Sequence, residues 1–141
     1  MSISIPENVM TALGILTKNG YSAYAVGGCV RDSLLGNKPD DWDICTSALP
    51  EQTAECFADY RVIPTGVKHG TITAIVEKPL EITTFRTEEG YSDGRHPDTV
   101  KFTTDIKKDL SRRDFTVNSI AYNKSTGFID PFGGAYDIKN K

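Results

Sequence analysis

The stretch PDDWDICTS, residues 39–47, places three aspartates within four positions and continues with residues typical of a buried strand. Successive side chains of a strand point to opposite faces, so Asp41 and Asp43 share one face while Trp42 and Ile44 share the other. The apolar face can pack against helices. The other face then holds two carboxylates roughly 6–7 Å apart. The stretch therefore predicts a strand with one buried face and one acidic face.

Two carboxylates this close repel each other, and one of them resists ionisation unless a cation lies nearby. Mg²⁺ prefers a few carboxylates together with phosphate oxygens and water. Two such ions about 4 Å apart can activate an attacking hydroxyl and stabilise the leaving oxygen of a phosphoryl transfer. Asp41 and Asp43 are thus candidate Mg²⁺ ligands. The alternative is a solvated turn in which Asp40 and Asp41 simply follow Pro39.

A candidate anion site precedes the aspartates in AVGGCVRDSLLG, residues 25–36. Gly27 and Gly28 allow the backbone to turn sharply and to approach a ligand closely. The start of the helix that follows can bind an anion, and Arg31 adds a planar donor for phosphate. A Gly-Gly turn is common by itself. Next to a metal-binding pair, however, it indicates a bound nucleoside triphosphate and nucleotidyl transfer.

Two further stretches contribute candidates. Glu81 in LEITTFR, residues 80–86, is a possible third carboxylate, but the strand pattern leaves open whether it faces the aspartates or is merely exposed.

In LSRRDFTVNSIAY, residues 110–122, a helix would bring Asp114 and Asn118 one above the other. Arg112 and Arg113 could then contact a triphosphate, and the other two could contact ribose hydroxyls. The alternative is a surface helix whose apolar side chains fill the core: Phe115, Val117 and Ile120.

The remaining pattern predicts short elements. Helices are expected at residues 4–20, 29–36 and 50–59, strands at 22–28, 41–47, 60–66, 70–77 and 80–86, and two helical pieces within 105–123. Ser4 with Glu7 forms a capping-box pattern, and Lys78–Pro79 is expected to form a hairpin turn. Residues 87–100, rich in glycine and charge, are expected to form a long loop. Asp105 and Ser111 are possible helix caps. Residues 128–141 are expected to form a strand, a turn and the beginning of a helix.

This order of elements favours an α/β (α+β-like) fold, in which a mixed sheet of about five strands has helices mainly on one face. The length of 141 residues allows one domain with one core.

The net charge of −3 is not typical of a domain that binds nucleic acid by itself. Three sparse cysteines favour reduced thiols and a cytoplasmic protein, and no apolar run approaches the length of a membrane helix. Without a C-x-x-C pair, a zinc site has little support.

Several segments together resemble the catalytic head of the class II tRNA nucleotidyltransferases. This family comprises the CCA-adding enzymes and the bacterial poly(A) polymerases, within the polymerase-β nucleotidyltransferase superfamily. The matching segments run in the family's order from about residue 23 to residue 138: GGCVRDSLLG with DWDICTSA, TGVKHGTITA, EITTFRTEEGYSDGRHPDTVKF, DLSRRDFTVNSIAYN and IDPFGG.

The resemblance implies roles for the matched residues. Asp41 and Asp43 would hold catalytic Mg²⁺, with Glu81 at the third acidic position. Residues lining the nucleotide site would be Gly27, Gly28, Arg31, Asp32, Arg112, Arg113, Asp114 and Asn118. Residues 87–100 match a flexible loop used to switch from C to A addition, and Arg95 is its expected working residue.

The resemblance also implies a function. The protein would add CMP and AMP from CTP and ATP to a tRNA 3′ end. An A-adding enzyme and a poly(A) polymerase are alternatives of the same class, and a nucleotide-binding module without transfer is an alternative of another class. The E-D-x-x-R element with which the family reads the base is absent from this chain. Residues 1–128 are therefore expected to form the head and residues 129–141 the start of the neck of a longer protein, whose missing part grips the tRNA.

Overall fold

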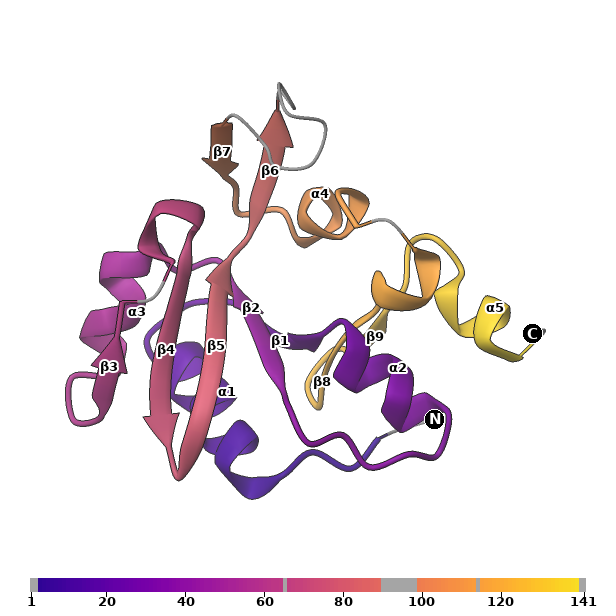
Figure 1. Ribbon diagram of the computed structural model, residues 1–141, viewed down its shortest axis with the longest axis horizontal. Coiled ribbons are helices and arrows are strands. Elements are labelled where there is room, and N and C mark those ends of the chain that lie inside the picture. The colour runs from indigo at the N-terminus through magenta and orange to yellow at the C-terminus, as the bar shows by residue number, and fades with distance from the viewer. Residues whose placement is uncertain (1–2, 65, 90–98, 114, 140–141) are drawn as a thin grey trace.

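The computed structural model describes residues 3–64, 66–89, 99–113 and 115–139 (Figure 1). Its helices are α1 (Glu7–Lys18), α2 (Gly28–Leu34), α3 (Pro50–Cys56), α4 (Ile106–Ser111) and α5 (Gly134–Lys139), with 3₁₀ turns η1 (Val67–His69) and η2 (Thr116–Asn118). Its strands are β1 (Ala23–Val26), β2 (Asp43–Thr46), β3 (Arg61–Ile63), β4 (Thr71–Val76), β5 (Lys78–Thr84), β6 (Arg86–Glu89), β7 (Thr99–Phe102), β8 (Ala121–Asn123) and β9 (Gly127–Ile129). Within the described ranges, no helix is long and apolar enough to cross a membrane.

Seven described strands form one mixed sheet in the order β3-β4-β5-β2-β1-β8-β9. Neighbouring strands are antiparallel except β2 and β5, which run parallel. The expected mixed sheet is confirmed, but the estimate of about five strands was too low. Residues 121–123 were assigned to a helix and instead form β8. Ala121 and Tyr122 are both buried and pair with Val26 and Ala25 of β1, so tertiary pairing overrides their local helical pattern.

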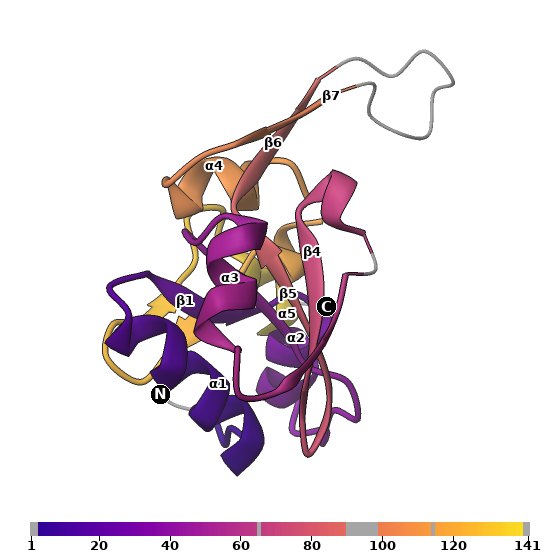
Figure 2. The ribbon, with the colours of Figure 1, turned by 90° about the vertical axis from the view of Figure 1, so that its left-hand side faces the viewer.

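Helices cover the two faces of the sheet unequally (Figures 1 and 2). The larger core joins α1, α2 and α3 to side chains such as Ala25 and Ile44. The smaller core lies on the opposite face, where Leu110 of α4 packs with Tyr24 and Cys45. Because α4 is short, it leaves the remainder of its face accessible. The prediction of helices mainly on one face is therefore confirmed.

Two local expectations were wrong. Helix α1 begins after Pro6, which is its N-cap and makes no side-chain capping bond, so the capping box of Ser4 and Glu7 does not form. The hairpin between β4 and β5 turns at Glu77, which has a positive φ of 66°, and not at Lys78–Pro79. Pro79 is tolerated inside β5 because the parallel pairing with β2 begins only at Glu81.

Strands β6 and β7 form a separate antiparallel ribbon that projects from the body of the molecule (Figure 2). Residues 87–89 and 99–100 were expected to belong to a loop and instead lie in this ribbon. The rest of that expected loop, including Arg95, lies outside the described residues. Figure 2 also shows that the ribbon continues directly from the β5 end of the sheet, so its position depends on how that end is held.

Candidate active site

The site begins at the one parallel pair of the seven-stranded sheet. Asp43 of β2 lies directly opposite Glu81 of β5 in the register, so the two side chains leave the sheet on the same face. Both are exposed, as is Asp41. Trp42 and Ile44 are buried in the larger core, as the alternating pattern predicted. The sequence left the direction of Glu81 open, and the register between two distant segments places it beside Asp43.

The pKa of Asp43 responds to several charged groups. Desolvation is the largest cause that raises the pKa of this carboxyl, even though its side chain keeps access to solvent. The negative charge of Glu81 raises the pKa further, Arg113 lowers it, and Asp41 adds a smaller increase. Three carboxylates and one guanidinium therefore lie within electrostatic range of one another.

This shift predicts how stability depends on pH. Because the pKa of Asp43 is raised on folding, the folded state binds the proton more tightly than the unfolded chain. The free energy of unfolding then falls as the pH rises from about 3.9, the ordinary pKa of an aspartate, through the raised pKa of Asp43. We expect Asp43→Asn to raise the melting temperature at pH 7 without divalent cations, and this gain to vanish below about pH 3.5. Thermal unfolding by circular dichroism in EDTA measures both.

The control for this prediction is Asp59→Asn, at an exposed residue that follows α3 on the other face of the sheet. It is expected to leave the pH dependence of the melting temperature unchanged. An equal gain from Asp43→Asn at pH 3 and at pH 7 would contradict the assignment of charge repulsion at Asp43.

The glycine turn lies between β1 and α2. Gly27 has φ 83° and ψ −141°, a conformation that side-chain-bearing residues rarely adopt. A Cβ atom added there would lie 3.7 Å from Nη1 of Arg113, and one added at Gly28 would lie 3.3 Å from Nη2 of Arg31. The two glycines therefore permit two arginine side chains to approach the backbone closely.

Arg31 is held in place by two neighbours. Its Nη1 donates to Oδ1 of Asn118 at 2.9 Å, and its Nε donates to Oδ1 of Asp32 at 3.0 Å. Arg31 thus joins two other predicted nucleotide-site residues, its neighbour Asp32 and Asn118, which lies 87 positions away in the sequence.

The predicted helix through residues 110–122 is interrupted. Helix α4 ends at Ser111, Phe115 is extended, and the chain resumes as the 3₁₀ turn η2. Asp105 caps α4 as expected, by accepting the N–H of Lys107 at 2.9 Å. Ser111 does not begin a second helix: it is the last residue of α4, and its hydroxyl donates to the carbonyl of Lys108 at 2.7 Å. The predicted stacking of Asp114 over Asn118 was based on one continuous helix, which does not exist. Asp114 itself lies outside the described residues.

The apolar side chains of this segment separate as well. Ile120 is fully buried and Val117 is partly buried, but Phe115 is 66% exposed and does not fill the core.

Helix α5 supports η2 from behind, which explains the IDPFGG segment. Asp130 accepts the N–H groups of Gly134 and Ala135 at 2.7 and 2.9 Å and so caps the start of α5. A Cβ atom at Gly134 would lie only 2.0 Å from the carbonyl oxygen of Thr116 in η2. This close contact holds η2, and with it Asn118, in position. Sequence reasoning assigned no structural role to Asp130 or Gly134.

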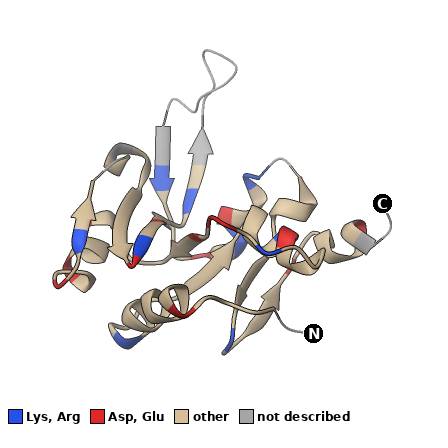
Figure 3. Ribbon diagram, turned by 60° about the horizontal axis from the view of Figure 1, so that its bottom comes forward, with Lys and Arg blue, Asp and Glu red and all other residues tan. Residues whose placement is uncertain are grey.

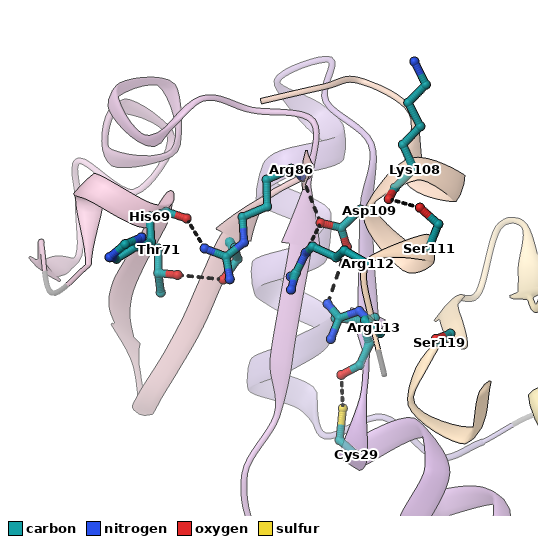
Figure 4. Close-up of polar contacts among 12 residues, drawn as sticks. Cys29, His69, Thr71, Arg86, Lys108, Asp109, Ser111, Arg112, Arg113 and Ser119 are labelled. Carbon is teal, nitrogen blue, oxygen red and sulfur yellow. Dashed lines mark hydrogen bonds and ion pairs between the residues drawn. The ribbon is translucent and has the colours of Figure 1, made fainter. Parts of the chain in front are cut away.

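Sequence reasoning also missed Asp109, whose carboxylate accepts hydrogen bonds from three donors (Figure 4). Its carboxylate is fully buried. Oδ1 accepts the backbone N–H of Arg86 at 3.0 Å and Nε of Arg112 at 3.4 Å, and Oδ2 accepts Nη2 of Arg113 at 3.4 Å. The signal was present, because Arg112 and Arg113 stand at i+3 and i+4 from Asp109 along a predicted helix.

The donors available to a metal ion are few. Among the described residues, no three Asp, Glu, His or Cys side chains form a cluster suited to a metal. The adjacent pair Asp43 and Glu81, with Asp41 close enough to affect the pKa of Asp43, fits an ion that uses one or two carboxylates and takes further ligands from phosphate and water. Mg²⁺ has this preference, so the residues present fit it.

Charge over the rest of the molecule does not separate into large patches. Figure 3 shows Lys and Arg interspersed with Asp and Glu along the described residues. This distribution agrees with the net charge of −3.

Comparison with known proteins shows the family. Residues 23–141 match the family model described as the Poly A polymerase head domain. The chain belongs to this family. The match confirms the resemblance inferred from the sequence, and it extends over the β1–α2 turn, the acidic pair and η2.

Relatives and solved structures agree with this family. A CCA-adding enzyme of Lactobacillus delbrueckii subsp. bulgaricus is 47% identical over 99% of this chain and 36% of its own length. A CCA-adding enzyme of Geobacillus kaustophilus is 47% identical over 92% of this chain and 33% of its own length. The crystal structure of the Bacillus stearothermophilus CCA-adding enzyme in complex with CTP has a TM-score of 0.80 at 41% identity, and the match covers 96% of this chain and 32% of that one.

A tRNA nucleotidyltransferase complexed with a primer tRNA and an incoming ATP analog is a further structural neighbour. It has a TM-score of 0.67 at 33% identity, over 92% of this chain and 37% of that one. The chain therefore spans about a third of the length of the curated relatives that it matches.

Proposed function

We propose that this chain is the catalytic head of a CCA-adding tRNA nucleotidyltransferase. The observation that carries the proposal is the pairing of Asp43 with Glu81 on an open face of the sheet, beside Arg113 and the Gly27 turn. An acidic pair next to an anion site is what transfer of a nucleotide requires. Relatives named as CCA-adding enzymes, one of them solved with CTP, support the choice of substrate.

In the proposed reaction, the 3′ hydroxyl of a tRNA gives up its proton to solvent, and its oxygen attacks the α-phosphorus of bound CTP or ATP. The bond from that phosphorus to the bridging oxygen breaks, and pyrophosphate leaves with the bonding electrons. Mg²⁺, held by Asp41 and Asp43 with Glu81 as the third acidic group, would supply charge stabilisation to the attacking and leaving oxygens.

The chain's own cations and glycines would bind the nucleotide. Arg112 and Arg113 are donors for the charge of the outer phosphates. Arg31, held by Asp32 and Asn118, would contact the phosphates at the Gly27–Gly28 turn. Asp114 and Asn118 would contact the ribose.

Other parts of the proposal concern segments beyond this site. The segment around Arg95 would help to reshape the pocket between C and A addition, which is a gating role. Residues 1–128 would form the head and residues 129–141 the start of the neck, and the main tRNA grip would lie elsewhere in a longer cytoplasmic protein. An A-adding enzyme or a poly(A) polymerase would use the same site residues with different substrates.

Nucleotide binding by the 141-residue chain tests the proposal. Because the E-D-x-x-R base reader is absent from it, we expect similar dissociation constants for CTP and ATP in the presence of Mg²⁺. Arg113→Ala should weaken both by about tenfold, because a charge-assisted contact to phosphate is lost. Isothermal titration calorimetry measures both effects.

The matched control is Arg61→Ala, which removes an exposed arginine from the edge strand β3. It is expected to leave both dissociation constants within a factor of about two, since distant surface charges are screened. Unchanged binding by Arg113→Ala, or equal weakening by Arg61→Ala, would refute the nucleotide site. Strong preference for one base would refute the proposed absence of base selection in this chain.

A further inference from the structure

Asp109 is the most enclosed acidic group described near the site, and it does not contact the acidic pair itself. It stands on α4, fully buried, above Cys45 of β2. A buried carboxylate is stable only when its oxygens are satisfied by donors or opposite charges. Three groups donate to the Asp109 carboxylate, and two of them are the arginines that the proposed function assigns to the triphosphate.

The two oxygens of the Asp109 carboxylate accept from different arginines. Oδ1 accepts from Nε of Arg112, whereas Oδ2 accepts from Nη2 of Arg113. Each oxygen therefore fixes a different guanidinium. Both arginine side chains are mostly buried, at 16% and 19% exposure, so the surrounding atoms restrict their orientations.

The third donor fixes the carboxylate relative to the sheet. It is the backbone N–H of Arg86, two residues beyond the end of β5, at 3.0 Å from Oδ1. The preceding residue, Phe85, is fully buried, and its own N–H bonds the carbonyl of Thr46 at the end of β2. Asp109 is thus tied to the ends of the same two strands that carry Asp43 and Glu81.

The position of Arg113 shows what this arrangement achieves. One of its terminal nitrogens, Nη2, faces Asp109, while the other, Nη1, lies near the point where a Cβ of Gly27 would stand. Arg113 is also the group that lowers the pKa of Asp43. A guanidinium that is anchored at one end in this way presents its other end to the glycine turn, within electrostatic range of Asp43.

We propose that Asp109 is a positioning residue for nucleotide binding. It sets the direction of the Arg112 and Arg113 guanidinium groups and locks them in register with the strands that carry the acidic pair. It touches neither nucleotide nor metal, and it acts through the arginines. This inference rests on the proposed function, since it assumes that these arginines bind the triphosphate.

The test is a double-mutant cycle on the 141-residue chain, with ATP and Mg²⁺ as the probe in calorimetry. Asp109→Asn keeps the size of the side chain and one carbonyl oxygen for the Arg86 N–H. It replaces the acceptor of Arg113 with an amide donor, so the guanidinium loses its anchor. We expect the dissociation constant to rise by about tenfold, the usual cost of losing a group that orients a ligand-binding side chain.

The cycle separates positioning from general damage to the fold. In a background that carries both Arg112→Ala and Arg113→Ala, Asp109→Asn is expected to weaken binding by less than about twofold, because both groups through which it acts are already gone. The matched control is Asp105→Ala, which removes the N-cap of the same helix and so destabilises it. It is expected to leave the dissociation constant within about twofold, since the bonds from Asp109 to the two arginines that follow α4 are retained.

Each outcome decides a different claim. If Arg113→Ala weakens ATP binding but Asp109→Asn does not, Asp109 is not a positioning residue and the proposed function stands. Additive losses in the combined variant would also overturn the inference, because they would show that Asp109 acts independently of both arginines. If Arg113→Ala has no effect, the proposed nucleotide site itself fails. Should Asp109→Asn fail to fold, Asp109→Glu serves in its place, and restored folding with tenfold weaker ATP binding would support the inference while unchanged binding would overturn it.

Discussion

Asp43→Ala in the complete protein is expected to lower nucleotide transfer by about a thousandfold or more while leaving the fold intact. The proposed metal contributes several kcal/mol of charge stabilisation, and about 4 kcal/mol corresponds to a thousandfold in rate. The fold should survive because removal of one carboxylate relieves the repulsion from Glu81 and Asp41 that raises the pKa of Asp43. Single-turnover assays with a tRNA that lacks its 3′ end measure the rate.

Asp41→Ala should give a loss of similar size if Asp41 is a second metal ligand. The matched control is Asp40→Ala, which changes a neighbouring aspartate outside the proposed ligand set. Its transfer rate should remain within about threefold of the original, since surface charges away from the metal are screened. Ordinary rates from Asp43→Ala would show that the acidic pair does not hold a catalytic metal, whatever else it binds.

Gly134→Ala is expected to be the most damaging single-methyl change in the described chain. The added Cβ would lie 2.0 Å from the carbonyl oxygen of Thr116 and 2.9 Å from Cγ1 of Ile120. The clashing oxygen belongs to the backbone of η2, so Thr116 cannot move without shifting Asn118 in the same turn. We expect a loss of about 3 kcal/mol in the free energy of unfolding, at the upper end of the usual cost of overpacking. Urea denaturation with matched slopes measures it.

Gly14→Ala supplies the control, because it makes the same chemical change in the middle of α1. Gly14 is exposed, and no heavy atom lies within 4 Å of the position of its added Cβ. We expect this variant to gain about 0.5–1 kcal/mol, the usual advantage of alanine over glycine inside a helix. If Gly134→Ala were as stable as Gly14→Ala, helix α5 would not be packed on η2 as the structure describes.

Local patterns were sufficient for much of the site. The alternation in residues 41–44 placed Trp42 and Ile44 in the core and the two aspartates outside, because a strand must turn alternate side chains to opposite faces. The pair Gly27–Gly28 indicated a sharp turn, and Gly27 indeed has a positive φ. Such features depend on neighbours in sequence, and the backbone stereochemistry that produces them is the same in any fold.

Features that depend on contacts between distant segments could not be predicted in this way. Whether Glu81 faces Asp43 depends on a parallel register between strands almost 40 positions apart, and a shift of one residue would turn Glu81 to the other face. Residues 121–122 have a helical pattern, yet burial against β1 makes them a strand. Asn118 reaches Arg31 only because α5 supports the turn on which it stands.

The sequence by itself therefore determined which residues carry charge, turn sharply or alternate, together with the family to which they belong. Only the tertiary structure decided which of these residues meet: Glu81 with Asp43, Asn118 with Arg31, and Asp109 with both arginines. The physical reason is that propensity and periodicity are properties of a few adjacent residues. Register and packing, by contrast, minimise the free energy of the whole chain at once, through apolar burial and satisfied polar groups.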